Sequence, residues 1–228
     1  MPLILIPTPI DEVSPLEQTA FTLLKEANAD DLILVEDLKP ARRRWLSFGL
    51  PREAIAQFKT FNEHHREELF PEVQVALKNH RRVFLMSDGG LPCFCDPGVE
   101  LVDFCHENKL PVTCTPIPNS LMMALILSGF SCDQFVFSGF LSRDAEQRAK
   151  DLSRLANEKR VQLLMETPYR LERLLEEFAR HSELGLRRLF LALDLGHETQ
   201  WLKRGKAQAM LEEVRGKKAE FVLVLDKY

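Results

Sequence analysis

Short apolar runs alternate with helix-like segments along most of the 228-residue sequence, and this alternation constrains the fold more than any other feature. Each run is a few residues long and rich in Val, Ile, Leu and Phe, as is typical of strands buried on both faces. The runs lie at residues 3–6, 32–35, 83–86, 112–114, 134–138, 161–165, 189–194 and 221–225. The sequence therefore predicts an α/β fold built on parallel strands.

Helices are predicted between these runs, where apolar residues recur at helical spacing. Ser14, Pro15 and Glu17 match a capping box, which predicts that Ser14 is the N-cap of the first helix. A long polar segment at 63–80 contains Pro71, which predicts that the helix is kinked or split there.

The segment TPIPN, residues 115–119, is expected to link two domains. Its two prolines, Pro116 and Pro118, disfavour both a helix and a central strand. We therefore expect an N-terminal α/β domain at residues 1–115 and a C-terminal α/β domain at 119–228.

The charge balance gives no overall attraction for nucleic acid, because 34 acidic residues outnumber 30 basic ones. Two basic clusters stand out locally, one at 39–44 beside Trp45 and one at 203–218. A solvated surface explains each of them, and contact with a phosphate backbone is the alternative.

The cysteines number five and have no regular spacing, which favours a reducing compartment and a cytoplasmic location. Cys93 and Cys95 are separated by one residue, a spacing that fits structural zinc poorly, so no metal is expected. No apolar run approaches the roughly 20 residues needed to span a bilayer, and no basic region precedes the apolar N-terminus as in a signal peptide. We therefore expect no association with a membrane.

The stretch VFLMSDGGLPCFCDPG, residues 83–98, passes from a predicted strand directly into a turn that carries Asp88, Gly89 and Gly90. Ligands bind open α/β sheets at the carboxyl ends of the strands. Glycines allow a positive φ and close approach of the backbone, and Ser87 and Asp88 supply oxygens. Chain reversal alone also explains the pattern, so a ligand cradle and a plain turn remain open at this point.

A second strand-end turn, METP at residues 165–168, also carries a carboxylate. Glu166 is either part of a binding site or a solvated residue beside a helix start at Thr167. A dinucleotide or nucleoside triphosphate site is not expected, because the sequence contains neither GxGxxG nor GxxxxGK[ST].

Several stretches, in order, resemble one family: LILIPTPI, LVEDLKPARRR, FLMSDGGLPCFCDPG, VTCTPIPNSLMMAL, LLMETPYRLERLLEEF and AEFVLVLD. They are similar to the tetrapyrrole methylase superfamily of S-adenosylmethionine-dependent methyltransferases, and within it to the branch that methylates a ribose 2′-hydroxyl of 16S rRNA. The resemblance covers nearly the whole chain. It implies two αβα domains with the cofactor S-adenosylmethionine in the cleft between them, in a homodimer.

The resemblance also implies which positions contact the cofactor. Carried over by position, they are Pro7, Ser87, Asp88, Gly89, Gly90, Leu91, Asn119, Ser120, Leu121, Met165, Glu166, Ala192, Leu193, Glu220 and Phe221. Most of them end a predicted strand or follow one.

The methyl acceptor is expected to be small-subunit rRNA, while the sequence departs from the rRNA branch at residues 11–14, 35–39 and 116–118. The alternatives are a tetrapyrrole or other small-molecule acceptor, and a relative that binds the cofactor without turnover. Methyl transfer depends chiefly on positioning the acceptor, and a carboxylate can take the hydroxyl proton. Among Glu36, Asp37 and Asp88, we choose Asp37 as the catalytic residue, because it follows a strand at the same sheet edge.

Overall fold

The structure, a computed structural model, describes residues 3–116 and 119–227 and divides into two compact units. The first unit is Met1–Asn119 and the second is Ser120–Tyr228. Ile117 and Pro118, the middle of the predicted link, lie outside the described residues. Each unit is therefore described by itself.

The first unit contains a sheet of five parallel strands in the order β3-β2-β4-β1-β5. Its strands are β1 (Leu3–Ile6), β2 (Leu32–Val35), β3 (Phe58–Thr60), β4 (Val83–Met86) and β5 (Val112–Cys114). Ile6 and Val35 both pair with Met86, so the last residues of β1, β2 and β4 stand side by side. The turns that follow these three strands consequently begin at one edge of the sheet.

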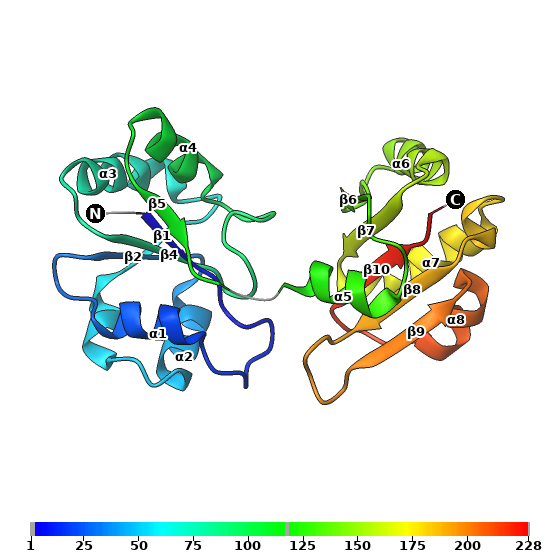
Figure 1. Cartoon of the computed structure of the whole chain (residues 1–228), viewed down its shortest axis with the longest axis horizontal. Helices are drawn as coiled ribbons and strands as arrows, with labels where there is room; N and C mark the ends of the chain where they lie inside the picture. Colours follow the sequence, from blue (N-terminus) through cyan, green and yellow to red (C-terminus); the bar gives the residue numbers. More distant parts are fainter. Residues whose placement is uncertain (1–2, 117–118, 228) are drawn as a thin grey trace. The chain divides into compact units, whose positions relative to one another are not determined.

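Helices cover both faces of this sheet, as Figure 1 shows. One face carries α1 (Gln18–Lys25) and α2 (Leu38–Ser47), and the other carries α3 (Arg66–Lys78) and α4 (Val99–Glu107). A 3₁₀ helix, η1 (Arg52–Gln57), follows α2. Successive strand residues point to opposite faces. The three central strands β1, β2 and β4 therefore supply apolar side chains to both core clusters, which explains why their residues are apolar without interruption.

The second unit contains a sheet in the order β6-β7-β10-β8-β9. Its strands are β6 (Phe135–Gly139), β7 (Val161–Glu166), β8 (Leu189–Leu193), β9 (Trp201–Gly205) and β10 (Phe221–Leu225). Only the β6–β7 pair is parallel, while β10 runs antiparallel to both β7 and β8, and β9 runs antiparallel to β8. The expectation of parallel strands is wrong for β9 and β10. The short β8–β9 connection reverses the chain, and β10, which follows β9 through α8, runs in the same direction as β9.

The helices of the second unit also form two layers around its sheet (Figure 1). One face carries α5 (Ser120–Ser128), and the other carries α6 (Ala145–Asn157), α7 (Leu171–Arg180) and α8 (Ala207–Val214). Two 3₁₀ helices, η2 (Pro168–Arg170) and η3 (Leu184–Leu186), flank α7. Both units therefore have the predicted αβα architecture. Within the described residues, no helix is long and apolar enough to cross a membrane.

Two predicted helix features differ in the structure. The first helix begins at Gln18 rather than near Ser14, because the carboxylate of Glu17 accepts a hydrogen bond from the amide of Ala20 and caps it. Pro71 lies inside α3, which continues as a single helix across it. Pro71 and Glu67, whose carbonyl loses its usual intrahelical donor, are both exposed, so water can hydrate that carbonyl.

Gly98, which precedes α4, is the glycine that the local packing requires most. Its φ is +123°, and a Cβ there would overlap Leu85 Cδ2 and lie 2.9 Å from Cys93 Sγ. Gly49 has a φ of +74°, and nothing lies within 4 Å of the place where its Cβ would be, so it shares the backbone strain but not the overlap.

We expect Gly98→Ala to lower the free energy of unfolding by about 2 to 5 kcal/mol, because backbone strain and overpacking add. The control Gly49→Ala should cost about 1 to 2 kcal/mol, from strain alone. Denaturant unfolding of both variants measures the difference. If both variants lose the same free energy of unfolding, Leu85 moves aside at no cost and the overlap does not destabilise the chain.

Candidate functional site

The turns after β1 and β4 are joined at the carboxyl edge of the first sheet. Thr8 and Gly90 exchange two backbone hydrogen bonds, each 3.0 Å long. The Thr8 hydroxyl donates to the Ser87 carbonyl at 3.1 Å, and the Ser87 hydroxyl donates to the Gly90 carbonyl at 2.7 Å. The predicted positions Pro7, Ser87, Asp88, Gly89, Gly90 and Leu91 therefore belong to one connected pair of turns.

The two glycines of this turn differ from each other. Gly90 has a φ of +92°, and nothing lies within 4 Å of the place where a Cβ would be. Gly89 does not have a left-handed φ, and its nearest neighbours, including Arg44 Nη1, would lie 3.9 Å from a Cβ. Of the two, only Gly90 adopts the positive φ that a glycine allows.

Carboxylates gather at the same edge. The amide of Asp88 donates to Glu36 Oε1 at 3.2 Å. Burial and the nearby charges of Asp96 and Asp88 raise the pKa of Glu36 to about 7. Burial, followed by the charge of Asp37, raises the pKa of Asp88, and the guanidinium of Arg44 opposes that shift. Burial also raises the pKa of Asp96. Such an acidic edge favours a ligand with a positive charge or with hydroxyl donors.

Arg44, near this edge, has a buried side chain with a structural role. It is 6% exposed and donates to the carbonyls of Pro9 and Asp11. Trp45, beside it, is fully buried in the core, and its indole donates to the Pro51 carbonyl. The aromatic residue of the first basic cluster therefore cannot stack on a base, and Arg44 is not part of a solvated surface.

Asp37, the predicted catalytic residue, is exposed at the start of α2. Its Oδ1 accepts a hydrogen bond from the Lys39 amide at 2.8 Å and so caps the helix. The neighbouring Asp88 has a buried atom, Oδ1, for which the described part of the chain provides no hydrogen-bond partner. A donor from a ligand would satisfy it.

Five predicted positions of the second unit lie on adjacent strands. Phe221 pairs with both Glu166 and Leu193, and one residue further along the strands Val222 pairs with Met165 and Ala192. Leu121 of α5 belongs to the same core cluster as Ala192, and Met165 packs against that cluster. Asn119 precedes α5 and Ser120 is its first residue. The carbonyl of Glu220 accepts a hydrogen bond from the Asp194 amide at 2.8 Å.

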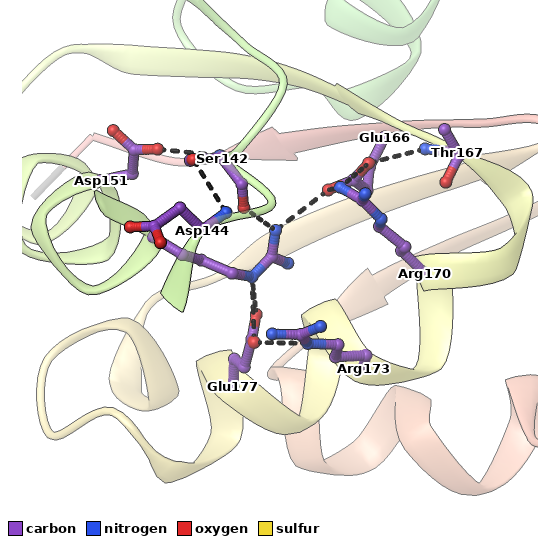
Figure 2. A network of polar contacts seen from close by, with 9 residues as sticks. Ser142, Asp144, Asp151, Glu166, Thr167, Arg170, Arg173 and Glu177 are labelled. Carbon is purple, nitrogen blue, oxygen red and sulfur yellow. Dashed lines mark hydrogen bonds and ion pairs between the residues drawn. The ribbon is translucent and has the colours of Figure 1, made fainter. Parts of the chain in front are cut away.

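The side chain of Glu166 takes part in a buried ionic network, drawn in Figure 2. Arg148 Nη1 lies 3.2 Å from Glu166 Oε2, and Arg148 Nε donates to Glu177 at 2.7 Å. Arg148 also donates to the Ser142 carbonyl at 3.2 Å. Arg170 contacts Glu166 at 3.3 Å from the side nearer solvent. Arg148 thus connects the loop before α6, the end of β7 and helix α7.

This network excludes one of the two interpretations of Glu166. Its carboxylate is buried, with a side-chain exposure of 1%, and it also accepts the Thr167 amide at 2.9 Å. The interpretation of Glu166 as a solvated residue is therefore wrong. Arg148 and Glu177 were missed, because α6 and α7 carry many charged residues and the sequence does not distinguish the buried members from the exposed ones.

The cysteines of the SDGGLPCFC loop differ in their surroundings. Burial raises the pKa of Cys93 to about 12, so its thiol stays protonated, whereas Cys95 is exposed and does not pack in the core. Across residues 3–116 and 119–227, no three His, Cys, Asp or Glu side chains are grouped so as to hold a metal ion.

Comparison with known families identifies a match over most of the chain. The family model described as Tetrapyrrole (Corrin/Porphyrin) Methylases matches residues 3–211.

Curated relatives match nearly the full length. A protein of Thermotoga maritima named ribosomal RNA small subunit methyltransferase I is 31% identical, over 98% of this chain and 97% of its own. Proteins with the same name are 33% identical in Synechocystis and 29% identical in Bacillus subtilis. These matches cover 98% of this chain in both cases, and 78% and 74% of the respective relatives.

Solved structures share the fold at low sequence identity. A diphthine synthase has a TM-score of 0.71 at 13% identity, with 99% of this chain and 90% of that one covered. A uroporphyrin-III C-methyltransferase of Thermus thermophilus has a TM-score of 0.55 at 16% identity, with 99% and 91% covered. The likeness concerns the fold and not the substrate.

We expect Arg148→Met to lower the free energy of unfolding by about 3 to 5 kcal/mol, because it leaves a buried carboxylate without its main cation. The matched control is Arg173→Met, which removes a 2.9 Å ion pair with the same Glu177 from an arginine that is 55% exposed. That variant should cost less than about 1 kcal/mol. Denaturant unfolding compares the two, and similar losses would contradict a dominant role of burial.

Glu36 makes the stability of the first unit depend on pH. Its pKa is about 7 in the folded chain and 4.5 for the ordinary group, so the folded state holds an additional proton between these values. The free energy of unfolding should therefore fall as the pH rises from about 4.5 to about 7. Glu36→Gln removes the titration and keeps an acceptor for the Asp88 amide, so its profile should fall less across this window. If the free energy of unfolding, measured by chemical denaturation, depends on pH in the same way for the unmodified chain and for Glu36→Gln, the raised pKa of Glu36 is wrong.

Proposed function

The chain belongs to the tetrapyrrole methylase family and is a methyltransferase, and we propose that it transfers a methyl group from S-adenosylmethionine to a ribose 2′-hydroxyl of small-subunit ribosomal RNA. The observation that carries the proposal is the near full-length similarity to relatives named for small-subunit ribosomal RNA. A cytoplasmic location follows from that substrate.

The acidic edge of the first sheet fits S-adenosylmethionine by its chemistry. The cofactor supplies a methyl group bonded to a sulfonium, and it also carries an ammonium group and ribose hydroxyls. We propose that Asp88 accepts one of these donors, because its buried Oδ1 lacks a protein partner among the described residues. The open space beside Gly90 leaves the backbone of the turn accessible to such a ligand.

The second unit is proposed to contribute its own sheet edge. The positions proposed to contact the cofactor in this unit are Asn119, Ser120, Leu121, Met165, Glu166, Ala192, Leu193, Glu220 and Phe221. In the first unit, the proposed positions besides Asp88 are Pro7, Ser87, Gly89, Gly90 and Leu91. The carboxylate of Glu166 is already occupied by Arg148, Arg170 and the Thr167 amide. We therefore propose that Glu166 offers main-chain atoms to the ligand, and that its side chain keeps the end of β7 in place.

The proton of the acceptor hydroxyl needs a base late in the transfer. As the ribose oxygen bonds to the methyl carbon, the carbon–sulfur bond breaks and the proton passes to a carboxylate. Asp37 is proposed for this role, because it is exposed at the same edge as Asp88. Glu36 is the second candidate, because its pKa of about 7 suits a base near neutral pH.

A homodimer is part of the proposal. Helix α5 exposes apolar side chains on one face, with Met122 37% and Ile126 70% exposed. Residues four apart lie on the same side of a helix, so these two form a continuous apolar strip that a second copy of the chain would cover.

Transfer of labelled methyl from S-adenosylmethionine into small subunits of a strain lacking this protein tests the proposal. We expect incorporation at one ribose, located by mapping the modified nucleotide.

Gly90→Val should abolish cofactor binding in calorimetry, because a β-branched residue does not tolerate a φ of +92°. Gly49→Val, with the same kind of strain away from the sheet edge, should still bind. Asp37→Asn should lower the transfer rate and leave cofactor affinity unchanged.

The other outcomes distinguish the alternatives. Incorporation into a tetrapyrrole or another small molecule, with none into RNA, would overturn the RNA substrate. Cofactor binding without transfer to any fraction would indicate a binding protein. Unchanged binding in Gly90→Val would overturn the assigned site.

A further inference from the structure

Two adjacent lysines in the second unit each lie over an aromatic ring. Lys217 Nζ is 5.0 Å from the centre of the Trp201 ring, and Lys218 Nζ is 5.2 Å from the centre of the Tyr169 ring. Both lysines are exposed, and neither forms an ion pair with another residue of the described chain. A cation–π contact holds an ammonium group in position without neutralising its charge.

The neighbouring basic residues differ from this pair. Lys203 lies 2.7 Å from Glu213, and Arg215 lies 4.0 Å from Glu172. Part of the second basic cluster is therefore neutralised within the unit. Lys217 and Lys218 keep their charges available for a partner.

The strand register places these residues at one particular edge of the sheet. Trp201 pairs with Leu193, which pairs with Phe221, which in turn pairs with Glu166. Tyr169 follows Glu166 by three residues, and the lysines precede Phe221 on the turn between α8 and β10. The two cation–π pairs therefore lie along the same edge as the cofactor positions proposed for this unit.

The chemistry of this edge matches a single-stranded nucleic acid. Two exposed ammonium groups suit phosphates of the backbone, and Tyr169, which is 79% exposed, offers an aromatic surface for a base. Trp201 is half-buried against the core beneath α7 and α8, so it serves as a support for Lys217.

We propose that Lys217, Lys218, Tyr169 and Trp201 form a docking surface for the backbone and one base of a single-stranded RNA segment. The inference rests on the proposed function and specifies where the RNA is held in the second unit. The net charge of −4 does not oppose RNA binding at this surface. Salt screens charges that lie far from the surface, so the nearby lysines determine the local attraction.

The test compares two double variants with the same change of charge. Lys217→Gln/Lys218→Gln removes the patch, and Lys159→Gln/Lys227→Gln removes two exposed lysines that flank the opposite edge, where β7 begins and β10 ends. Binding of a small-subunit RNA fragment is measured over a range of salt concentrations. We expect the patch variant to reduce the slope of log affinity against log salt by about 1 to 1.5, and the control to keep it.

A second pair of variants tests the base contact. Tyr169→Ala should weaken RNA binding by about fivefold or more with little change in the salt slope, because stacking is lost. Tyr169→Phe should bind as the unmodified chain does, because the ring is kept. Thermal unfolding and calorimetry with S-adenosylmethionine check that folding and cofactor binding are intact.

The inference and the proposed function fail in different ways. If the unmodified chain methylates RNA while both double variants have the same affinity and salt slope, the docking surface is wrong and the function stands. If the unmodified chain binds S-adenosylmethionine but neither binds nor methylates small-subunit RNA, the proposed function is wrong.

Discussion

The alignment of strand ends in each sheet is the constraint on which the candidate site depends. In the first unit, Met86 pairs with Ile6 on one side and Val35 on the other, so three separate turns start from one line. In the second unit, Phe221 fixes Glu166 and Leu193 in the same way. A shift of register by one residue would turn each apolar side chain to the other face, and the two core clusters of each unit oppose such a shift.

The arrangement of charge follows from this alignment. The edge of the first sheet is acidic, with carboxylates whose protonation burial favours, and its buried cation, Arg44, is engaged by main-chain carbonyls. The edge of the second sheet carries two exposed lysines, Lys217 and Lys218, and Glu166, whose carboxylate pairs with Arg148. The two edges thus differ in charge: the first is acidic, while the second places exposed lysines beside the carboxylates of Asp194 and Glu220.

The sequence predicted the central strands well because a strand buried on both faces leaves an uninterrupted apolar run. The edge strands β3 and β9, FKT and WLKRG, were missed because one side of each needs no strand partner and polar residues are tolerated there. At the candidate site, Ser87–Gly90 could be predicted from turn chemistry. The burial of Arg148 and Trp45 could not, since it depends on tertiary packing that charge and aromatic patterns do not encode.

The position of β10 in the middle of its sheet bears on how the chain folds during synthesis. The first sheet has all its strands once residue 114 has been made, so the first unit can fold early. The second sheet lacks the strand between β7 and β8 until residues 221–225 appear. Until then the facing edges of β7 and β8 have no partner, and the growing chain exposes two apolar strand edges that are prone to association with other chains.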